Sequence, residues 1–179
     1  MLIESSDSFG GGFTCATADC GRGQVACNGA GEPRLHPSQN SHRHQTGAQD
    51  THHISLVDGL NLPISITPQG GSGEKCTTTS CGVNINADCP LIWLTGSDGS
   101  IIGCKSACLA FNEPQYCCKD QYNSSSTCEL TSYSMFFKNK SPQAYSYASD
   151  DTSSTFSCSG STNYLLLSAH NEFHFYVII

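Results

Sequence analysis

The sequence has few charged residues, which make up only 13% of its 179 positions. Eight basic residues stand against 15 acidic ones, so the formal net charge is −7. A nucleic-acid surface needs a basic stripe, and this balance argues against a nucleic-acid partner. No run of residues is apolar for the roughly 20 positions that a membrane helix requires, so we expect no transmembrane segment.

Cysteine, in contrast, is abundant, with twelve residues that make a reducing compartment a poor match. No CxxC pair occurs, and the spacing from Cys104 to Cys128 does not fit a zinc finger or ribbon. We therefore expect a disulfide framework with no bound metal and no cofactor. The adjacent Cys117 and Cys118 are expected to bond to two different partners.

The start of the chain does not match this cysteine content. Met1–Thr14 reads MLIESSDSFGGGFT, which lacks both the basic and the apolar segments of a secretory leader. Because a disulfide protein needs export, the simplest interpretation is that the chain lacks its natural beginning.

Histidines gather in the polar stretch Glu32–His53, which shows no hydrophobic period. Imidazole is a common metal ligand, so His42, His44, His52 and His53 form a conceivable metal site. We favour a loop or poorly ordered segment with incidental histidines.

Period-two spacing of apolar residues over His53–Pro68 predicts two strands, broken at the turn dipeptide Asp58-Gly59. The following Gln69–Gly73 is predicted to be a flexible loop. Asp150–Tyr164 has a strand-like composition, and the end of the chain, His174–Ile179, is an apolar run of β-prone residues.

A hairpin is predicted for Leu91–Thr95 and Ile101–Ile102, which flank the turn residues Ser97-Asp98-Gly99. Gly103–Asn112 is the best helix candidate, with Cys104 and Cys108 on one face and Pro114 as its stop.

Four segments resemble one family in the same order along the chain. They are GGFTCATADCGRGQVAC (Gly11–Cys27), SLVDGLNLPISITPQGGSG (Ser55–Gly73), CKSACLAFNEPQYCC (Cys104–Cys118) and the stretch Tyr133–Cys158. All resemble the thaumatin-like proteins, the secreted, disulfide-stapled defence proteins of plants. The resemblance runs from Gly11 to Leu167, with a strong departure only at Glu32–His53.

The resemblance implies a mainly β fold, an incomplete antiparallel β-sandwich with a disulfide-rich lobe that contains a short helix. We expect one truncated domain over residues 1–179. Residues 1–75 and 142–179 are assigned to the sandwich and ribbon, and residues 76–141 to the lobe.

The family's framework of eight bridges implies five pairs here: Cys20–Cys27, Cys76–Cys158, Cys89–Cys104, Cys108–Cys117 and Cys118–Cys128. Cys15 is expected to be unpaired because its partner falls upstream of Met1. Cys81 is expected to be unpaired because Ser141 stands where the family has its partner cysteine. Three missing bridges predict a marginal or aggregating protein.

Family members carry an acidic cleft built from an Arg, a Glu and three Asp. Asp58 matches one Asp, and Asp150 or its neighbour Asp151 matches another. Asn40 and His53 stand at the positions of the Glu and the remaining Asp, and the Arg falls upstream of Met1. Each surviving Asp also has a plain interpretation as a turn residue.

Three aromatic residues, Tyr116, Phe136 and Tyr145, suggest sugar stacking, although core packing is the default interpretation. Asn123 and Asn139 each begin an N-glycosylation sequon, the second of which exists because residue 141 is Ser.

The function implied by the resemblance is antifungal plant defence by an extracellular monomer that binds β-1,3-glucan of the fungal wall in the cleft. A weak endo-β-1,3-glucanase is one alternative, against which the missing Glu and Arg argue, so the chain is not expected to be an enzyme. An inhibitor of digestive enzymes has no local support. A degenerate truncated product without activity remains the other alternative.

Overall fold

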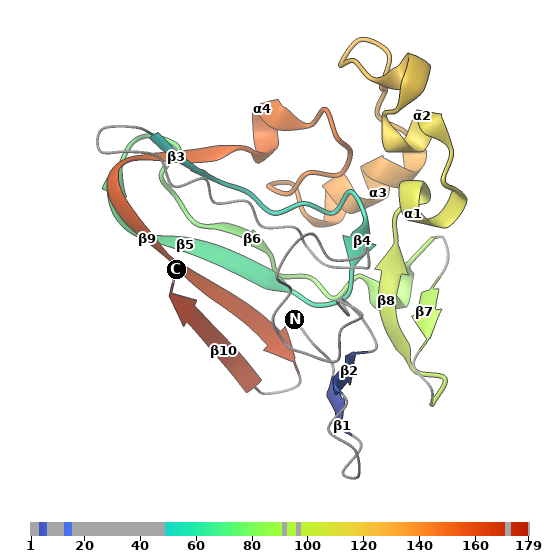
Figure 1. The fold of residues 1–179 in the computed structure, drawn as a ribbon, viewed down its shortest axis with the longest axis horizontal. Coiled ribbons are helices and arrows are strands. Elements are labelled where there is room, and N and C mark those ends of the chain that lie inside the picture. The colour runs from blue at the N-terminus through green and yellow to red at the C-terminus, as the bar shows by residue number, and fades with distance from the viewer. Residues whose placement is uncertain are drawn as a thin grey trace.

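A computed structural model describes residues 4–6, 13–15, 49–90, 93–95, 98–170 and 173–178 (Figure 1). The predicted Cys20–Cys27 bridge, the side chain of Cys15, His42, His44 and Asn40 lie outside the residues so described.

The largest sheet is antiparallel and is organised around one long strand, β9 (Phe156–His170). Strand β5 (Ile64–Ser72) pairs with one edge of β9 and carries β6 (Thr79–Cys81) on its other side. The other edge of β9 pairs with β3 (Gln49–His52) near its start and with β10 (Phe173–Ile178) near its end. The apolar end of the chain is therefore a strand, as predicted.

Two smaller sheets complete the β structure. Strands β4 (Gly59–Leu60), β8 (Ile101–Lys105) and β7 (Trp93–Thr95) form a three-stranded antiparallel sheet in that order. The β7–β8 pair is the hairpin that the turn residues predicted. Strands β1 (Glu4–Ser6) and β2 (Phe13–Cys15) form a separate two-stranded ribbon.

The helices are short and follow the β7–β8 hairpin (Figure 1). They are α1 (Ala107–Phe111), α2 (Pro114–Cys117), α3 (Ser132–Lys140) and α4 (Asp151–Ser154), with one 3-10 turn, η2 (Asp120–Tyr122), after α2. A further 3-10 turn, η1 (Asn86–Asp88), precedes the hairpin. The structure is thus mainly antiparallel sheet with a few short helices, which confirms the predicted fold class. No helix in the described ranges is long and apolar enough to cross a membrane.

The predicted helix Gly103–Asn112 was wrong in its first half. Cys104 lies on strand β8, and the helix starts only after Ser106, whose hydroxyl accepts a hydrogen bond from the backbone N–H of Leu109. A serine in that position caps a helix because it satisfies an N–H group that has no partner in the first turn. Pro114 does not stop this helix but opens the next one, where its missing N–H costs nothing.

One predicted loop was also wrong, and a second was wrong over Gln49–His52, the part of it that forms a described strand. Gln69–Gly73 is mostly strand, because β5 continues to Ser72 and accommodates the glycines with a register shift between Gly70 and Ser72. The last residues of the polar stretch form β3, in which His52 is fully buried. Its ring lies 5.0 Å from that of Tyr164, and burial lowers the pKa of His52. His52 is therefore a core residue.

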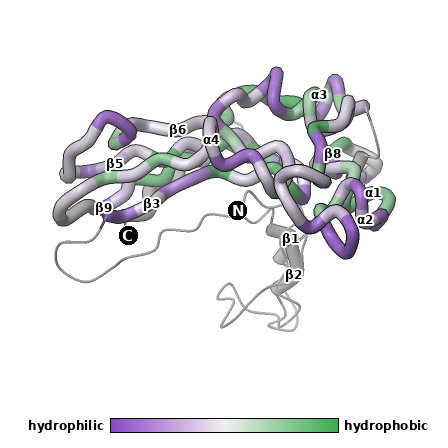
Figure 2. The backbone as a smooth tube through the Cα atoms, turned by 90° about the horizontal axis from the view of Figure 1, so that it is seen from above, coloured by the Kyte–Doolittle hydropathy of each residue, from purple (hydrophilic) through white to green (hydrophobic). Residues whose placement is uncertain are grey.

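One hydrophobic cluster joins the sheet to the helical region. It contains Ile54, Leu56 and Ile66 from the sheet side and Phe137 from α3, each at most 1% exposed. Apolar stretches accordingly recur in the strands and again near α1 and α3 (Figure 2). This shared core fixes the segments that carry the candidate site.

Candidate functional site

Asp58 lies in a tight turn that connects the core segment to β4. The N–H of Gly59 donates to the carbonyl of Leu56 (2.9 Å), and Gly59 has φ 119°, a conformation that favours glycine. The carbonyl of Asp58 accepts from the N–H of Ser106 (3.2 Å), which ties the turn to the start of α1. The turn interpretation of Asp58 therefore holds for its backbone, while its carboxylate remains available.

The carboxyl of Asp58 is half-buried. Burial raises the pKa of Asp58 because a charged form is costly away from water, and the cation of Lys119 partly offsets this shift.

A backbone bridge brings a distant segment next to this turn. The N–H of Leu56 donates to the carbonyl of Tyr145 (2.7 Å), and the N–H of Tyr145 donates to the carbonyl of Ile54 (2.8 Å). The residue between them, Ser55, forms a parallel bridge with Tyr145. The polar residues that follow Tyr145 are therefore anchored to the segment that leads into Asp58.

The side chain of Tyr145 contacts three polar residues. Its hydroxyl donates to Oδ1 of Asp151 (2.7 Å) and lies 2.5 Å from the hydroxyl of Thr155. The ring of His53 lies 5.0 Å from the ring of Tyr145. Burial is the main cause of the raised pKa of Tyr145, and the bond to Thr155 opposes the shift. Asp151 itself is exposed, so its second oxygen faces solvent.

Asp150 is held quite differently from its neighbour. Its Oδ2 accepts from Nζ of Lys138 (2.9 Å) and from the N–H and hydroxyl of Ser146 (3.1 Å each). Its Oδ1 accepts from the hydroxyl of Ser153 (2.9 Å). With 9% of its surface exposed and four donors on its oxygens, Asp150 acts as the centre of a structural network. Asp151 is the better-placed of the two for a ligand.

Lys138 completes this network from the last turn of α3. Besides Asp150, its ammonium donates to the carbonyl of Ala144 (3.2 Å) and to the hydroxyls of Ser153 (2.7 Å) and Ser154 (2.9 Å). Lys138 was not among the candidate residues predicted from the sequence. A lone lysine in a helical stretch carries no signal until the fold supplies its partners.

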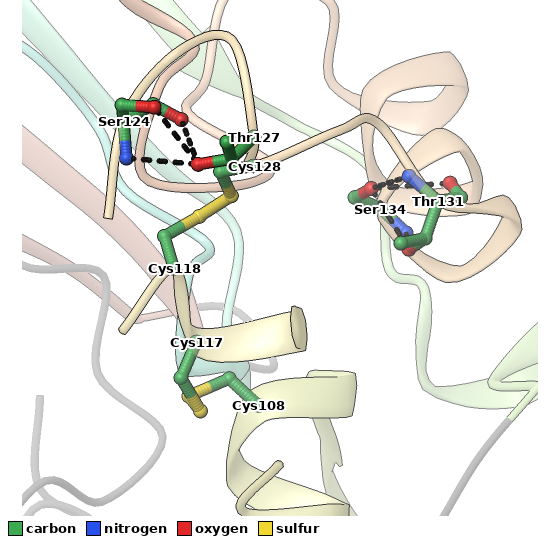
Figure 3. The surroundings of a disulfide bond; sticks show 8 residues. All are labelled: Cys108, Cys117, Cys118, Ser124, Thr127, Cys128, Thr131 and Ser134. Carbon is green, nitrogen blue, oxygen red and sulfur yellow. Dashed lines mark hydrogen bonds between the residues drawn. A yellow bond between two sulfur atoms is a disulfide. The ribbon is translucent and has the colours of Figure 1, made fainter. Parts of the chain in front are cut away.

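The disulfides hold the helical region together. The structure joins the expected pairs Cys76–Cys158, Cys89–Cys104, Cys108–Cys117 and Cys118–Cys128. Adjacent Cys117 and Cys118 bond to different partners and so pin α2 to both α1 and the loop before α3 (Figure 3).

Cys81 is a free, buried cysteine. Its Sγ forms a short contact with the hydroxyl of Ser141, which is only 1% exposed. Burial raises the pKa of the Cys81 thiol. The structure therefore places Ser141 beside Cys81, where the family resemblance expected a second cysteine.

A family model described as the Thaumatin family matches residues 4–169. The chain belongs to the thaumatin family. Thaumatin-like protein 1 of Pyrus pyrifolia is 55% identical over 155 residues, which cover 86% of this chain and 63% of that protein. Thaumatin-like protein 1 of Prunus persica is 52% identical over 162 residues, covering 90% and 65%.

A third thaumatin-family relative is named for an enzymatic activity. Glucan endo-1,3-beta-glucosidase of Prunus avium is 49% identical over 162 residues, covering 90% of this chain and 66% of that protein. The chain thus spans slightly less than two thirds of the length of these relatives.

The two sequons of this thaumatin-family chain differ in their surroundings. Asn123 and Ser125 are both exposed in the loop after η2. Asn139 is exposed at the end of α3, but the Ser141 of its sequon is buried against Cys81. Of the two, Asn123 offers the accessible site in the folded chain.

Proposed function

We propose that this chain is an extracellular plant defence protein that binds β-1,3-glucan of fungal walls through the exposed polar groups around Asp58 and Asp151. The observation that carries the proposal is the 49% identity to a relative named glucan endo-1,3-beta-glucosidase. That name links β-1,3-glucan to a protein whose sequence aligns with 90% of this chain.

The chemistry of the face supports a sugar ligand. The carboxylates of Asp58 and Asp151 are acceptors for sugar hydroxyls, and the His53 ring adds a further polar group beside Tyr145. These groups come from segments joined by the Leu56–Tyr145 backbone bridge. A preorganised set of this kind loses little conformational entropy on binding.

We propose binding without hydrolysis. A glycosidase needs two carboxyl groups roughly 5–9.5 Å apart, one of them free to exchange a proton with the leaving oxygen. Asp150 is engaged by Lys138 and two serines, so its carboxylate is not free to exchange a proton. These contacts favour a binding protein over the weak endo-β-1,3-glucanase alternative.

The test is electrophoresis of the oxidised chain in native gels that contain laminarin, combined with an assay for released reducing sugar. We expect retarded migration, no release of sugar, and loss of retardation in a chain carrying Asp58→Asn and Asp151→Asn. Asp88→Asn, an exposed carboxylate paired with Lys140 (2.6 Å), is the matched control.

Two other outcomes of these assays would favour one of the alternatives. Sugar release that Asp58→Asn abolishes would establish the enzyme alternative. Absence of any retardation of a correctly oxidised chain would overturn the proposal and favour a product without activity.

A further inference from the structure

A second feature lies on the disulfide-rich side of the molecule and is lined by neither Asp58 nor Asp151. It is an open groove of about 450 Å³, within the roughly 300–1,000 Å³ typical of small-molecule sites. Three tyrosines and three polar residues define its chemistry: Tyr116, Tyr122, Tyr133, Gln115, Glu129 and Ser132. We call it the tyrosine groove.

The walls of the tyrosine groove are tied in place by covalent and local bonds. One wall is α2, bridged at Cys117 to α1 and at Cys118 to Cys128. Another wall is the start of α3, where Thr131 and Ser134 cap each other's N–H groups (Figure 3). A capping box of this kind fixes the first turn of a helix. The groove therefore exists before any ligand arrives.

The aromatic rings of the groove support one another. Tyr116 and Tyr133 meet edge to face, with ring centroids 5.7 Å apart, and Phe111 lies within 5.6 Å of both. All three tyrosines are only half-buried, so part of each ring is open to the groove. Rings locked by neighbours present a stacking surface at small entropic cost.

Several polar groups of the groove are free to bind a ligand, whereas Nε2 of Gln115 donates to Oε2 of Glu113 (2.8 Å). Within the described part of the chain, the Glu129 carboxylate and the hydroxyls of Tyr116, Tyr122 and Tyr133 take part in no hydrogen bond or ion pair with another residue. The lining includes one carboxylate and no cationic side chain. This charge disfavours anionic ligands such as phosphate chains, as does the net charge of −7.

From these contacts we infer that the tyrosine groove is a second carbohydrate site, which binds a short stretch of a neutral, β-linked pyranose chain. The faces of such sugars carry C–H groups that pack on tyrosine rings, while their equatorial hydroxyls reach carboxylate, amide and hydroxyl groups. The alternation of rings with Gln115, Glu129 and Ser132 matches both demands. The inference shares its class of ligand with the proposed function but uses different residues.

A proline-rich peptide is the competing occupant, because aromatic grooves also bind polyproline segments. Such a peptide offers backbone carbonyls to the tyrosine hydroxyls, but its prolines have no N–H to donate to the Glu129 carboxylate. The Glu129 carboxylate needs a donor, which sugar hydroxyls supply, and therefore favours a sugar chain over a peptide.

The experiment uses the oxidised full chain in native gels containing laminarin, a soluble β-1,4-glucan or glycol chitin. Tyr122→Ser and Tyr133→Leu remove a ring at two separate places, so that a folding defect in one leaves the other informative. Leu130→Ala is the matched control, since Leu130 is 46% exposed and does not line the groove. A chain carrying Asp58→Asn and Asp151→Asn reports on the first site.

We expect each tyrosine variant to weaken the apparent affinity for at least one polysaccharide roughly tenfold, and Leu130→Ala to leave it unchanged. If both tyrosine variants are still retarded and only the Asp58/Asp151 variant is not, the inference is overturned and the proposed function stands. If both tyrosine variants lose retardation and the Asp58/Asp151 variant keeps it, the tyrosine groove is supported and the proposed site around Asp58 and Asp151 is overturned. Saturable binding of a polyproline peptide that Tyr122→Ser abolishes, with no retardation by any polysaccharide, would also overturn the inference.

Discussion

The disulfide-rich region and the segment that follows it are stabilised by different means. From Cys89 to Cys128, three disulfides connect helices of four or five residues to their surroundings. The next segment, up to α4, is held by Lys138, Asp150 and the hydroxyls around them.

The difference follows from how much apolar surface each region buries. The sheet side contributes Ile54, Leu56, Leu60 and Ile66 to the core, whereas the buried apolar residues around α1 and α2 are Ala107, Cys117 and Cys128. A region with so small a core depends on covalent links. Where the core is adequate, a network of polar side chains is enough to position a surface.

The largest expected effect comes from comparing a long-range bridge with a local one. Cys76–Cys158 closes 82 residues and Cys108–Cys117 closes nine. Replacing both cysteines of the first pair by serine is expected to lower the free energy of unfolding by roughly 4–5 kcal/mol, against roughly 2–3 kcal/mol for the second pair. Urea unfolding measures both values. Equal losses would show that native-state contacts, rather than the unfolded chain, set the contribution of each bridge.

Adding a disulfide tests the contribution of long-range bridges in the opposite direction from removing one. Ser141→Cys places a second thiol beside Cys81, 60 residues away in the sequence. A bridge there is expected to add about 2–4 kcal/mol and to raise Tm by about 5–15 °C. Adding Cys81→Ser to Ser141→Cys is the control, because it leaves only one thiol. If the Tm of the Ser141→Cys chain does not rise under oxidising conditions, the predicted pairing of Cys81 with position 141 is contradicted.

The sequence was informative where a residue type has few structural roles. The family resemblance implied the four bridges found among the described residues, and Asp98-Gly99 marked the turn between β7 and β8. The glycine-rich segment Gln69–Gly73 was predicted to be a loop, but tertiary pairing with β9 overrides its low strand propensity.

The site was less predictable than the fold. The sequence offered Asp150 and Asp151 as equivalent candidates, and only the position of Lys138 distinguishes a structural carboxylate from an exposed one. The tyrosine groove also depends on residues up to 18 positions apart, and no period links Gln115 to Tyr133. Such sites arise from the path of the chain and the disulfides that hold it.

The network around Asp150 is the next target, with an exposed ion pair as its reference. Asp150→Ala leaves the Lys138 ammonium partly buried without its counter-charge, and we expect a loss of about 2–3 kcal/mol in the free energy of unfolding. Asp88→Ala breaks the exposed pair with Lys140 and is expected to cost less than about 1 kcal/mol. Thermal unfolding in 0.05 and 0.5 M salt compares the two. Similar costs would mean that solvent screens the Asp150 network as well.

The smallest expected effect is a pH dependence at Asp58, on the turn that connects the core segment to β4. Because burial raises the pKa of Asp58, the folded chain binds this proton more tightly than the unfolded chain does. Its contribution to stability is therefore greatest below the unfolded pKa of about 3.9 and is lost as the pH rises through the folded pKa. Asp58→Asn, which does not titrate, is expected to gain in Tm relative to the parent between pH 3 and pH 7.

Asp98 supplies a control of opposite sign on the exposed β7–β8 turn. Its carboxylate accepts from the hydroxyl (2.7 Å) and the N–H (3.0 Å) of Ser100, and these bonds lower the pKa of Asp98. That contribution is present above the unfolded pKa and is lost as the pH falls through the folded pKa. Asp98→Asn is therefore expected to lose Tm relative to the parent over the same range. If the Tm of both variants changed in the same direction relative to the parent, burial would not distinguish the carboxyl of Asp58 from that of an ordinary turn aspartate.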